Sequence, residues 1–510
     1  MEPVEGGTGS PNVEEKPRFA AQDADQGWKY LESHDQASQP EYMDMKALRR
    51  RIDWHIVPIM FACYTMQFLD KVLINYAAVM GLNQDLKLKG NNFTNAATAF
   101  FIAYLIAEIP NVYFLQKVPA AKWLGANVVL WGLMTAFTGA VKDYGGLLAV
   151  RILLGVFEAT IGPSLMLISS QWYTKSEQAP RFSCWYLGLG LGQISGGILS
   201  FGFQHVENAS IEGWRVMFIV LGIVTVIIGI CTFLLLPDTP MQARWLSEEQ
   251  KVSLLRHVSV NQVGIINRRF RMGQVVEALL DPQVYLLTLC VILQSVSSGV
   301  VTTYSATLIR SLGFSPKNAA LLNMPSGIVS ITFVLLVGFG IRHASNRWAW
   351  IAFCSIPGMI GGGLMSFLPH TNTAGLLMGI YLVNAITAPL PIIYQWTAAN
   401  CAGHTKRAFA SAAVAGSFSV GNIIGPQTFQ ARDAPDYHPA KVAVLATQAG
   451  AAVVAVILFL YYYWANKKRG AETGLGPNQA EEVNAQHSSS ETEAWGGLTD
   501  KENRNFRYVY

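Results

Sequence analysis

Long apolar stretches of similar length, separated by short polar connections, constrain this chain more than any other feature. Each approaches the roughly 20 residues that an α-helix needs to cross the hydrocarbon core of a bilayer. In lipid the backbone must satisfy its own hydrogen bonds, so we predict an all-α membrane protein with twelve transmembrane helices. The predicted spans are 56–80, 93–116, 123–141, 147–171, 182–203, 214–236, 284–306, 318–341, 348–368, 374–396, 407–430 and 441–465.

The scarcity of charge supports a membrane protein over the alternative, a large soluble helical protein. Only 14% of the residues are charged, whereas soluble domains carry about 25%. The charges lie between the apolar stretches and at the two ends. We ascribe the formal net charge of +4 to the loops, and we expect no nucleic-acid partner. The first 50 residues contain no apolar run, so we expect no cleavable signal peptide.

Lys and Arg are unevenly distributed over the predicted connections. On one side they gather at 46–51, 244–271 and 467–469, whereas the connections on the other side carry fewer. Cytoplasmic loops of membrane proteins are enriched in Lys and Arg. We therefore expect both termini in the cytoplasm, which requires an even number of spans.

One long charged connection divides the spans into two sets of six. Such a layout is typical of two bundles that rock about a central site. Within the long connection, Ser247-Glu248-Glu249-Gln250 indicates the start of an amphipathic helix, and we expect the polar stretch after about residue 470 to be mobile. The predicted parts are a cytoplasmic N-terminal tail (1–50), an N-terminal six-helix bundle (51–236), a cytoplasmic linker (237–282), a C-terminal six-helix bundle (283–466) and a cytoplasmic C-terminal tail (467–510).

Five ionisable residues fall inside predicted spans, where charge is costly and usually paired or functional. They are Asp70, Lys71, Glu108, Arg151 and Glu158. Neighbours on a helix point about 100° apart, so Asp70 and Lys71 should not pair with each other. Arg151 and Glu158 share a helix face but lie about 10 Å apart along its axis, so each should meet a different group.

These charges suggest a division of roles. Lys71 and Arg151 are candidates for binding an anionic substrate. Asp70 and Glu158 are candidates for proton coupling, because partial desolvation favours the protonated form of a carboxylate. Alternatives stay open: Arg151 could form a structural ion pair at the cytoplasmic start of its helix, Asp70 could neutralise a neighbouring cation, and Glu108 could serve packing or gating.

The second half offers polar and aromatic side chains in place of buried charge. We predict that Tyr304 in helix seven and Asn384 in helix ten bind substrate. Pro389 and Pro391 should distort helix ten and free carbonyl groups, which membrane helices tolerate beside a cavity.

Glycines mark two helices for close packing. Gly188 and Gly192 lie in helix five, and Gly425 with Pro426 ends helix eleven. Small residues let helix backbones approach closely, so these positions serve either gating or ordinary packing.

Other motifs are sparse. The sequence has no Walker loop for ATP, and no His/Cys cluster suggests a metal, so we expect no cofactor, no metal and no enzymatic activity. The sequon at Asn208 lies on a predicted outward loop. We expect the six cysteines to pack as small apolar residues without forming disulfides; they are Cys63, Cys184, Cys231, Cys290, Cys354 and Cys401.

Several separated motifs carry a resemblance to a known family. The run from Arg151 to Glu158, followed by Gly162-Pro163, is similar to an R-x-x-x-G-x-x-E signature. Other similar segments are 237–247, 421–427, 433–437 and 498–508. On these motifs the chain resembles the major facilitator superfamily and, within it, the fungal anion:cation symporters typified by allantoate permease.

The resemblance implies two six-helix bundles with helices one, four, seven and ten around a cavity. It implies proton-coupled uptake of a small organic anion at the plasma membrane, with allantoate, ureidosuccinate, nicotinate, pantothenate and biotin among the family's substrates. Protons would be the coupling ion, and a monomer is expected. Relatives often have Arg at the position that matches Lys71. Lysine keeps the positive charge but lacks the planar guanidinium that binds a carboxylate through two parallel hydrogen bonds.

The sequence departs from the superfamily pattern in one loop, and rival functions remain. The superfamily's G-x-x-x-D-R-x-G loop between helices two and three is degenerate here, since 116–123 lacks the Asp. One rival is a proton antiporter that exports a metabolite or drug, although helix five lacks the proline typical of drug exporters. Another is a nutrient-sensing transceptor, although the tails are short.

Overall fold

The computed structural model describes residues 44–206, 211–259, 271–341, 343–434, 436–473, 499–503 and 506–510; the sequon at Asn208 lies outside them. The described residues form helices and no strand. The first half contains α2 (Met45–Val79), α3 (Leu82–Asp85), α4 (Asn92–Lys117), α5 (Ala120–Thr138), α6 (Tyr144–Glu158), α7 (Ile161–Trp172), α8 (Lys175–Tyr186), α9 (Gly188–Phe203) and α10 (Gly213–Leu235).

The long connection and the second half complete the chain. The connection contains η1 (Pro240–Gln242), α11 (Glu248–Ser259) and α12 (Met272–Leu279). The second half contains α13 (Pro282–Ser311), α14 (Pro316–Leu322), α15 (Met324–Gly340), α16 (Arg347–Phe367), α17 (Thr373–Val383), η2 (Asn384–Thr387), α18 (Pro389–Asn400), α19 (His404–Gln427), η3 (Ala431–Asp433) and α20 (His438–Thr473).

The twelve-helix architecture is confirmed. Ten helical stretches of the described chain are long and apolar enough to cross a membrane, and α6–α7, α14–α15 and α17–α18 each count as one of them. The other two predicted spans correspond to α5 and to α8–α9. The latter stretch is less apolar because Glu177 and Arg181 lie near its start and Gly and Ser fill much of the rest.

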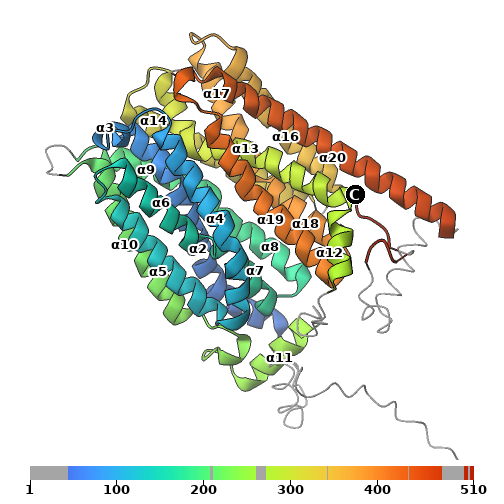
Figure 1. Ribbon diagram of the computed structural model, residues 1–510. Coiled ribbons are helices and arrows are strands. Elements are labelled where there is room, and N and C mark those ends of the chain that lie inside the picture. The colour runs from blue at the N-terminus through green and yellow to red at the C-terminus, as the bar shows by residue number, and fades with distance from the viewer. Residues whose placement is uncertain are drawn as a thin grey trace, which may run out of the picture.

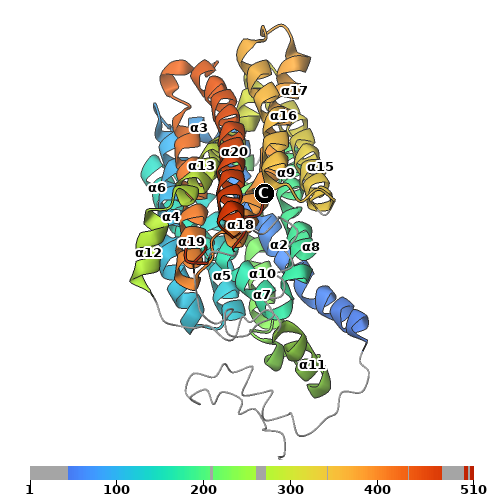
Figure 2. The ribbon, with the colours of Figure 1, turned by 90° about the vertical axis from the view of Figure 1, so that its right-hand side faces the viewer.

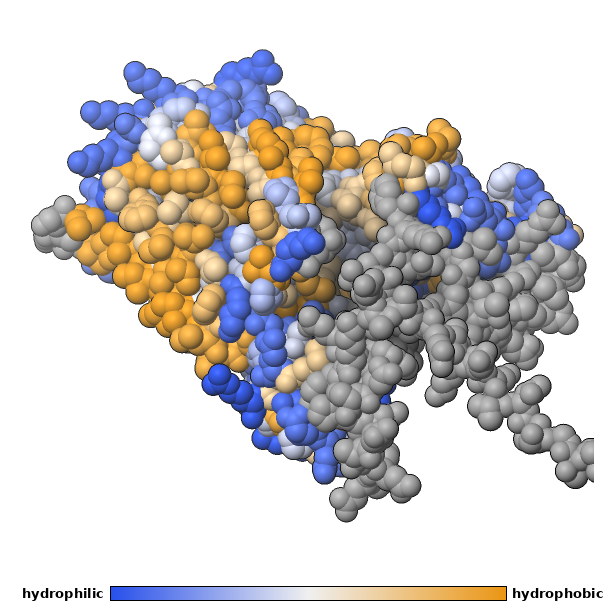
Figure 3. Space-filling view, turned by 60° about the horizontal axis from the view of Figure 1, so that its bottom comes forward, coloured by the Kyte–Doolittle hydropathy of each residue, from blue (hydrophilic) through white to orange (hydrophobic). Residues whose placement is uncertain are grey.

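The helices form two bundles that stand side by side (Figures 1 and 2). Helices α2 to α10 make one bundle, and α13 to α20 make the other. In both views α11 lies at one end of the molecule and α17 at the opposite end. We call the end with α11 the linker side and the other end the far side. Apolar residues form a belt on the flank of the molecule between polar ends (Figure 3), as expected for a surface that faces lipid.

Glycines allow the closest helix contacts within the first bundle. A Cβ atom on Gly222 of α10 would lie 2.4 Å from the backbone nitrogen of Ala136 in α5, and one on Gly132 would lie 2.8 Å from that of Val226. Real Cβ atoms do not approach this closely, so α5 and α10 pack backbone against backbone.

The first transmembrane helix is longer than expected. Helix α2 begins at Met45, where Asp44 accepts hydrogen bonds from the backbone N–H groups of Lys46 and Ala47. Such an N-cap satisfies donors that a helix start otherwise leaves unpaired. The helix therefore extends into the stretch that we assigned to the N-terminal tail, and the apolar pattern alone missed this polar first part.

Several of the described spans are interrupted, and two of these breaks lie at residues considered in the sequence. The fourth span breaks between α6 and α7, directly after Glu158. The tenth changes to the 3₁₀ segment η2 before α18 begins at Pro389. This distortion agrees with the effect expected of the two prolines, since proline lacks the N–H that continues an α-helix.

The amphipathic helix predicted in the linker is α11. Ser247 and Gln250 form its capping box, with hydrogen bonds in both directions between their side chains and backbone N–H groups. Its His257 Nε2 lies 3.0 Å from Glu177 Oε1 of α8. These contacts fix the linker against the linker side of the first bundle.

Candidate substrate site

The first transmembrane helix brings a lysine against a glutamate of the fourth. Lys71 Nζ of α2 lies 3.3 Å from Glu158 Oε1, at the end of α6. The Glu158 side chain is 0% exposed and that of Lys71 is 10% exposed. The Gln67 amide, one turn before Lys71, lies next to the same carboxylate. As expected from helix geometry, Lys71 does not pair with its neighbour Asp70.

A second pair of opposite charges lies beside the first. Asp70 faces away from Lys71 and accepts a hydrogen bond of 2.9 Å from Thr135 Oγ1 of α5. Its closest basic neighbours include Arg151 of α6, whose own acidic neighbours are Asp70 and Glu158. Arg151 is only 4% exposed. Four charges of alternating sign thus share the middle of the first bundle.

The structure contradicts the alternative role that we considered for Arg151. Helix α6 begins at Tyr144, so Arg151 lies well inside the span instead of at a cytoplasmic helix end. Within the described residues, the Nε and Nη2 groups of Arg151 have no hydrogen-bond acceptor although they are buried. Unsatisfied buried donors are rare and costly, and the carboxylates of Asp70 and Glu158 beside this guanidinium also have buried oxygens without a hydrogen-bond partner among the described residues.

A small cavity joins the two cations to the second bundle. Lys71 and Arg151 line it from one side, and Thr302 and Thr303 of α13 line it from the other. Its remaining walls are apolar: Ile74, Ala97, Phe100 and Phe101. A site with two cations, two hydroxyl groups and apolar walls can bind the charged end of a small organic anion.

Aromatic rings surround the Lys71 ammonium group. Its Nζ lies 5.2 Å from the centre of the Tyr104 ring of α4 and 5.6 Å from that of Phe418 in α19. The two rings come from different bundles, so both bundles contact the same cation. Glu108, one turn after Tyr104, is half-buried and also has Lys71 as its charged neighbour.

A larger cavity of about 100 Å³ lies elsewhere between the bundles. Phe182 and Tyr186 of α8, Val337 of α15, and Pro391 and Gln395 of α18 contribute to its walls. Among the described residues, none with a charged side chain lines it. The smaller cavity therefore has the charged groups that an anion requires, and the larger one is a mainly apolar space elsewhere between the bundles.

The structure does not bring Tyr304 or Asn384 to the cavity with the two cations. Tyr304 stacks on Phe429, with ring centres 4.0 Å apart, and its hydroxyl lies 2.5 Å from Thr94 Oγ1 of α4. Asn384 is in η2 and donates to the carbonyl of Ile380, 2.9 Å away. Tyr304 lies towards the far-side end of α13, and Asn384 turns back on its own helix.

The predicted glycines pack helices within a bundle. A Cβ on Gly188 would lie 2.5 Å from Thr65 Oγ1, and one on Gly192 would lie 3.1 Å from the backbone of α2. A Cβ on Gly425 would lie 2.4 Å from the carbonyl oxygen of Val296 in α13. Pro426 packs at the same contact, 3.0 Å from the Cβ position of Gly299.

Hydrogen bonds join the two bundles on the far side. Asn75 of α2 donates to Ser305 of α13 over 2.9 Å. Asn91 donates to Gln430 over 2.6 Å. Together with the contact between Thr94 and Tyr304, these bonds close the far-side end of the interface.

Sequence reasoning did not select Gln67, Tyr104 and Phe418 as site residues. A signal for two of them existed. Gln67 lies one helical turn before Lys71, and Tyr104 one turn before Glu108, so each extends a polar helix face. Phe418 offered no such signal, because an aromatic residue in an apolar span is ordinary.

The fold and this site define a polytopic membrane transporter with a buried charged centre. The chain belongs to the Major Facilitator Superfamily, whose family model matches residues 60–426. A thiamine pathway transporter of Saccharomyces cerevisiae is 37% identical to it, over 90% of this chain and 86% of that protein. Allantoate permease of the same yeast is 31% identical, over 100% of this chain and 94% of that protein.

Solved structures share the fold. A D-xylose-proton symporter superimposes with a TM-score of 0.61 at 15% sequence identity, covering 79% of this chain and 97% of that one. A bacterial homologue of the human lysosomal transporter Spinster gives a TM-score of 0.58 at 18% identity, covering 79% of this chain and 96% of that one. The comparisons support transport as the function and place the chain with fungal permeases of the allantoate permease type.

Proposed function

We propose that this transporter carries a small organic anion into the cell together with protons, by alternating access across the plasma membrane. The observation that supports this most is Arg151, whose buried Nε and Nη2 groups have no acceptor among the described residues. Lys71 lines the same cavity. A bound carboxylate would supply the missing acceptors, and charge-assisted hydrogen bonds of this kind are strong.

The substrate class follows from the residues that line the cavity. Two threonines line the cavity together with the two cations, and the remaining walls are apolar or aromatic. An allantoate-, nicotinate-, pantothenate- or biotin-like carboxylic acid combines an anionic end with a less polar body. The relative named allantoate permease supports this class.

Coupling to protons is proposed to occur at the pair of Lys71 and Glu158. While Glu158 is ionised, its carboxylate neutralises Lys71 across 3.3 Å. A substrate carboxylate competes for the same ammonium group. Protonation of Glu158 releases Lys71, so the proton and the anion are best accommodated together. Asp70 is a charged neighbour of Arg151 and is the second candidate for protonation.

Alternating access would then be a rocking motion of the two bundles about this centre. The bonds that join the bundles on the far side would have to break when that side opens. We further propose that the linker side faces the cytoplasm, that both termini are cytoplasmic and that the protein works as a monomer.

The test is uptake of a panel of radiolabelled carboxylic acids by permease-deleted yeast that expresses the protein, with and without a proton uncoupler. We expect one acid to accumulate in a saturable manner and the uncoupler to abolish its accumulation. Lys71→Ala should abolish this uptake at unchanged surface expression, whereas Lys89→Ala, at an exposed lysine, should not.

Other outcomes refute parts of the proposal. If uptake persists in the Lys71→Ala variant, Lys71 has no role in substrate binding. If preloaded cells lose a compound faster when the protein is present and no acid accumulates, the protein is an exporter.

A further inference from the structure

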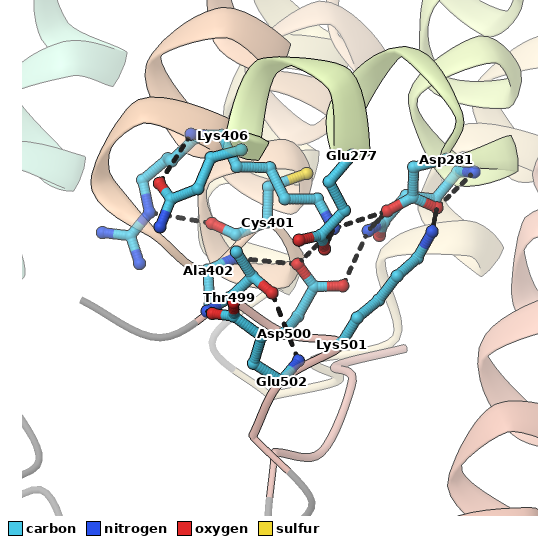
Figure 4. Close-up of polar contacts among 12 residues, drawn as sticks. Glu277, Asp281, Cys401, Ala402, Lys406, Thr499, Asp500, Lys501 and Glu502 are labelled. Atoms are coloured by element: carbon cyan, nitrogen blue, oxygen red, sulfur yellow. Dashed lines mark hydrogen bonds and ion pairs between the residues drawn. The ribbon is translucent and has the colours of Figure 1, made fainter. Parts of the chain in front are cut away.

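A buried lysine at the linker side is surrounded by three carboxylates, one of which comes from the end of the chain. Lys406, near the start of α19, is 0% exposed. Its Nζ lies 2.8 Å from Glu277, 2.6 Å from Asp281 and 2.7 Å from Asp500. An ammonium group has three N–H donors, so each can bond one carboxylate. Figure 4 shows this cluster.

Asp500 is the residue that closes the cluster. Besides Lys406, its side chain accepts hydrogen bonds from the backbone N–H of Ala402 (3.3 Å), from Gln283 Nε2 (3.1 Å) and from the Tyr508 hydroxyl (2.8 Å). Like Lys406, it is 0% exposed. This corrects the expectation that the whole polar end of the chain is mobile, because residues 499–503 and 506–510 are bound to the second bundle.

The same segment joins the end of α18 to the end of α20. Trp396 Nε1 and Asn400 Nδ2 of α18 both donate to the carbonyl of Val509, over 2.8 and 2.9 Å. On the other side, Asn466 of α20 exchanges two hydrogen bonds with the backbone of Tyr508. The segment therefore connects two helix ends through its own backbone.

Helix α18 is the part of the second bundle that most needs such a connection. It is separated from α17 by the 3₁₀ segment η2, and Pro389 begins it. A break of this kind is a natural pivot. Helix α18 also supplies Pro391 and Gln395 to the apolar cavity between the bundles. A pivot of α18 would therefore change access to this space from the linker side.

We propose that residues 499–503 and 506–510 form a releasable latch, anchored by the contacts of Asp500, that holds α18 against α19 and α20. With the latch docked, α18 moves only with its bundle. With the latch released, α18 pivots at η2 and alters access to the space between the bundles. The bound occupant of this surface is the chain's own C-terminal segment.

A native thiol reports whether the latch is docked. Cys401 lies beside the cluster (Figure 4) and is 0% exposed. Burial and, second, the charge of Asp500 raise the pKa of the Cys401 thiol to about 12, which suppresses its reactivity. Release of the segment removes the charge of Asp500 from beside this thiol. Cys63, Cys290 and Cys354 are buried elsewhere, whereas Cys184 and Cys231 are exposed and are replaced by Ser for the assay.

The first experiment measures maleimide labelling of Cys401 in the purified full-length chain with Cys184→Ser and Cys231→Ser. Asp500→Asn should accelerate labelling roughly tenfold or more, the ratio that corresponds to about 1.4 kcal/mol of docking free energy. Lys501→Ala is the matched control, because Lys501 is partly exposed and lies 3.7 Å from Asp281; it should change the rate less than about twofold.

A synthetic peptide with the sequence of residues 499–510 should restore protection to a chain that lacks them, and the same peptide with Asn at the Asp500 position should not. Equal labelling of the Asp500→Asn variant and the control would show that Asp500 does not hold the segment. Failure of the peptide to protect Cys401 would show that the segment does not bind as a separable ligand.

The second experiment distinguishes a latch from a merely structural tail. Hydrogen exchange of Asp500→Asn should accelerate in residues 389–406 and stay unchanged in the far-side half of α13. If exchange accelerates uniformly over both bundles, the segment only stabilises the whole fold and the proposal is wrong. If exchange in residues 389–406 is unchanged, the proposal is also wrong. Neither experiment needs a substrate, so their outcome is independent of the proposed function.

Discussion

The pair of Lys71 and Glu158 allows a quantitative test of how strongly the two central helices are coupled. The pair is buried and its charged atoms are 3.3 Å apart. With an effective dielectric constant of about 20, two unit charges at this distance attract each other by about 5 kcal/mol. Removal of one partner from a buried pair typically costs about 3–5 kcal/mol, because the other charge stays behind without compensation.

A double-mutant cycle isolates this coupling. We expect Lys71→Met and Glu158→Gln each to lower the free energy of unfolding by about 3 kcal/mol, and the combined variant to lose only about 1 kcal/mol. These values give a coupling energy of about 5 kcal/mol, with a lower bound of about 2 kcal/mol. The lower bound applies because a Glu158 left alone can take up a proton, which limits the penalty.

The assay is thermal and denaturant-induced unfolding of the purified variants in one detergent, followed by uptake measurements. The control cycle uses Lys251 and Glu248 of α11, whose charged atoms are 2.9 Å apart but whose glutamate is 61% exposed. Exposed pairs couple by about 0.5 kcal/mol. Additive single effects at Lys71 and Glu158, or a coupling no larger than in the control, would refute the reasoning. The combined variant should be folded and inactive in uptake.

Three further outcomes are expected. Gly425→Ala should lower the melting temperature, because its Cβ would lie 2.4 Å from a carbonyl oxygen of α13, whereas Gly202→Ala, with nothing within 4 Å of its Cβ position, should not. Tyr304→Phe keeps the ring but loses a hydrogen bond worth about 1 kcal/mol. Labelling of a cysteine placed beneath the hydrogen bonds that join the two bundles on the far side should therefore become about five times faster. Burial would raise the pKa of Asp436, but the hydrogen bond and charge of Lys441, together with the nearby His370 and His438, outweigh burial and hold the pKa below its usual value. The contact therefore stabilises the folded chain above about pH 4, and this stability is lost as the pH falls through the lower pKa of the folded state. In Asp436→Asn, the melting temperature should therefore depend less on pH in the acid range.

The spans of this chain could be predicted because bilayer thickness fixes helix length. The distortion of the tenth span could be predicted too, since two closely spaced prolines cannot continue an α-helix. The linker helix was predicted from Ser247, since a capping residue marks a helix start whatever the tertiary contacts are. These features depend on neighbours in the sequence, which is why the sequence alone was sufficient.

The site residues depend on contacts that no local pattern encodes. The sequence placed Lys71 and Asp70 on different faces of one helix, but it did not give the rotation of that helix against the fourth span. That rotation determines that Lys71 meets Glu158 and leaves Asp70 with Thr135. Arg151 was assigned a competing role at a helix end, because the start of its span was not known well enough.

The end of the chain illustrates a different limit. A polar composition predicts mobility because such a segment has little apolar area to bury. Asp500 is an exception to this rule, because the ammonium group of the buried Lys406 binds its carboxylate at 2.7 Å. Composition averages over a window, whereas this contact joins residues that are far apart in the sequence, and only the fold brings them together.

Charge balance connects the site to the proposed coupling. The centre holds three carboxylates, Asp70, Glu108 and Glu158, and two cations, Lys71 and Arg151. An anion that enters alone adds one uncompensated negative charge to a buried region, which costs several kcal/mol. An anion that enters with one proton leaves the net charge of the site unchanged. The empty and the fully loaded transporter would then carry the same net charge in the site, so both could change conformation. The half-loaded forms would carry a different net charge and would change conformation only at a higher free-energy cost. Under the coupling proposed above, one proton per monocarboxylate is the stoichiometry that would keep this net charge constant.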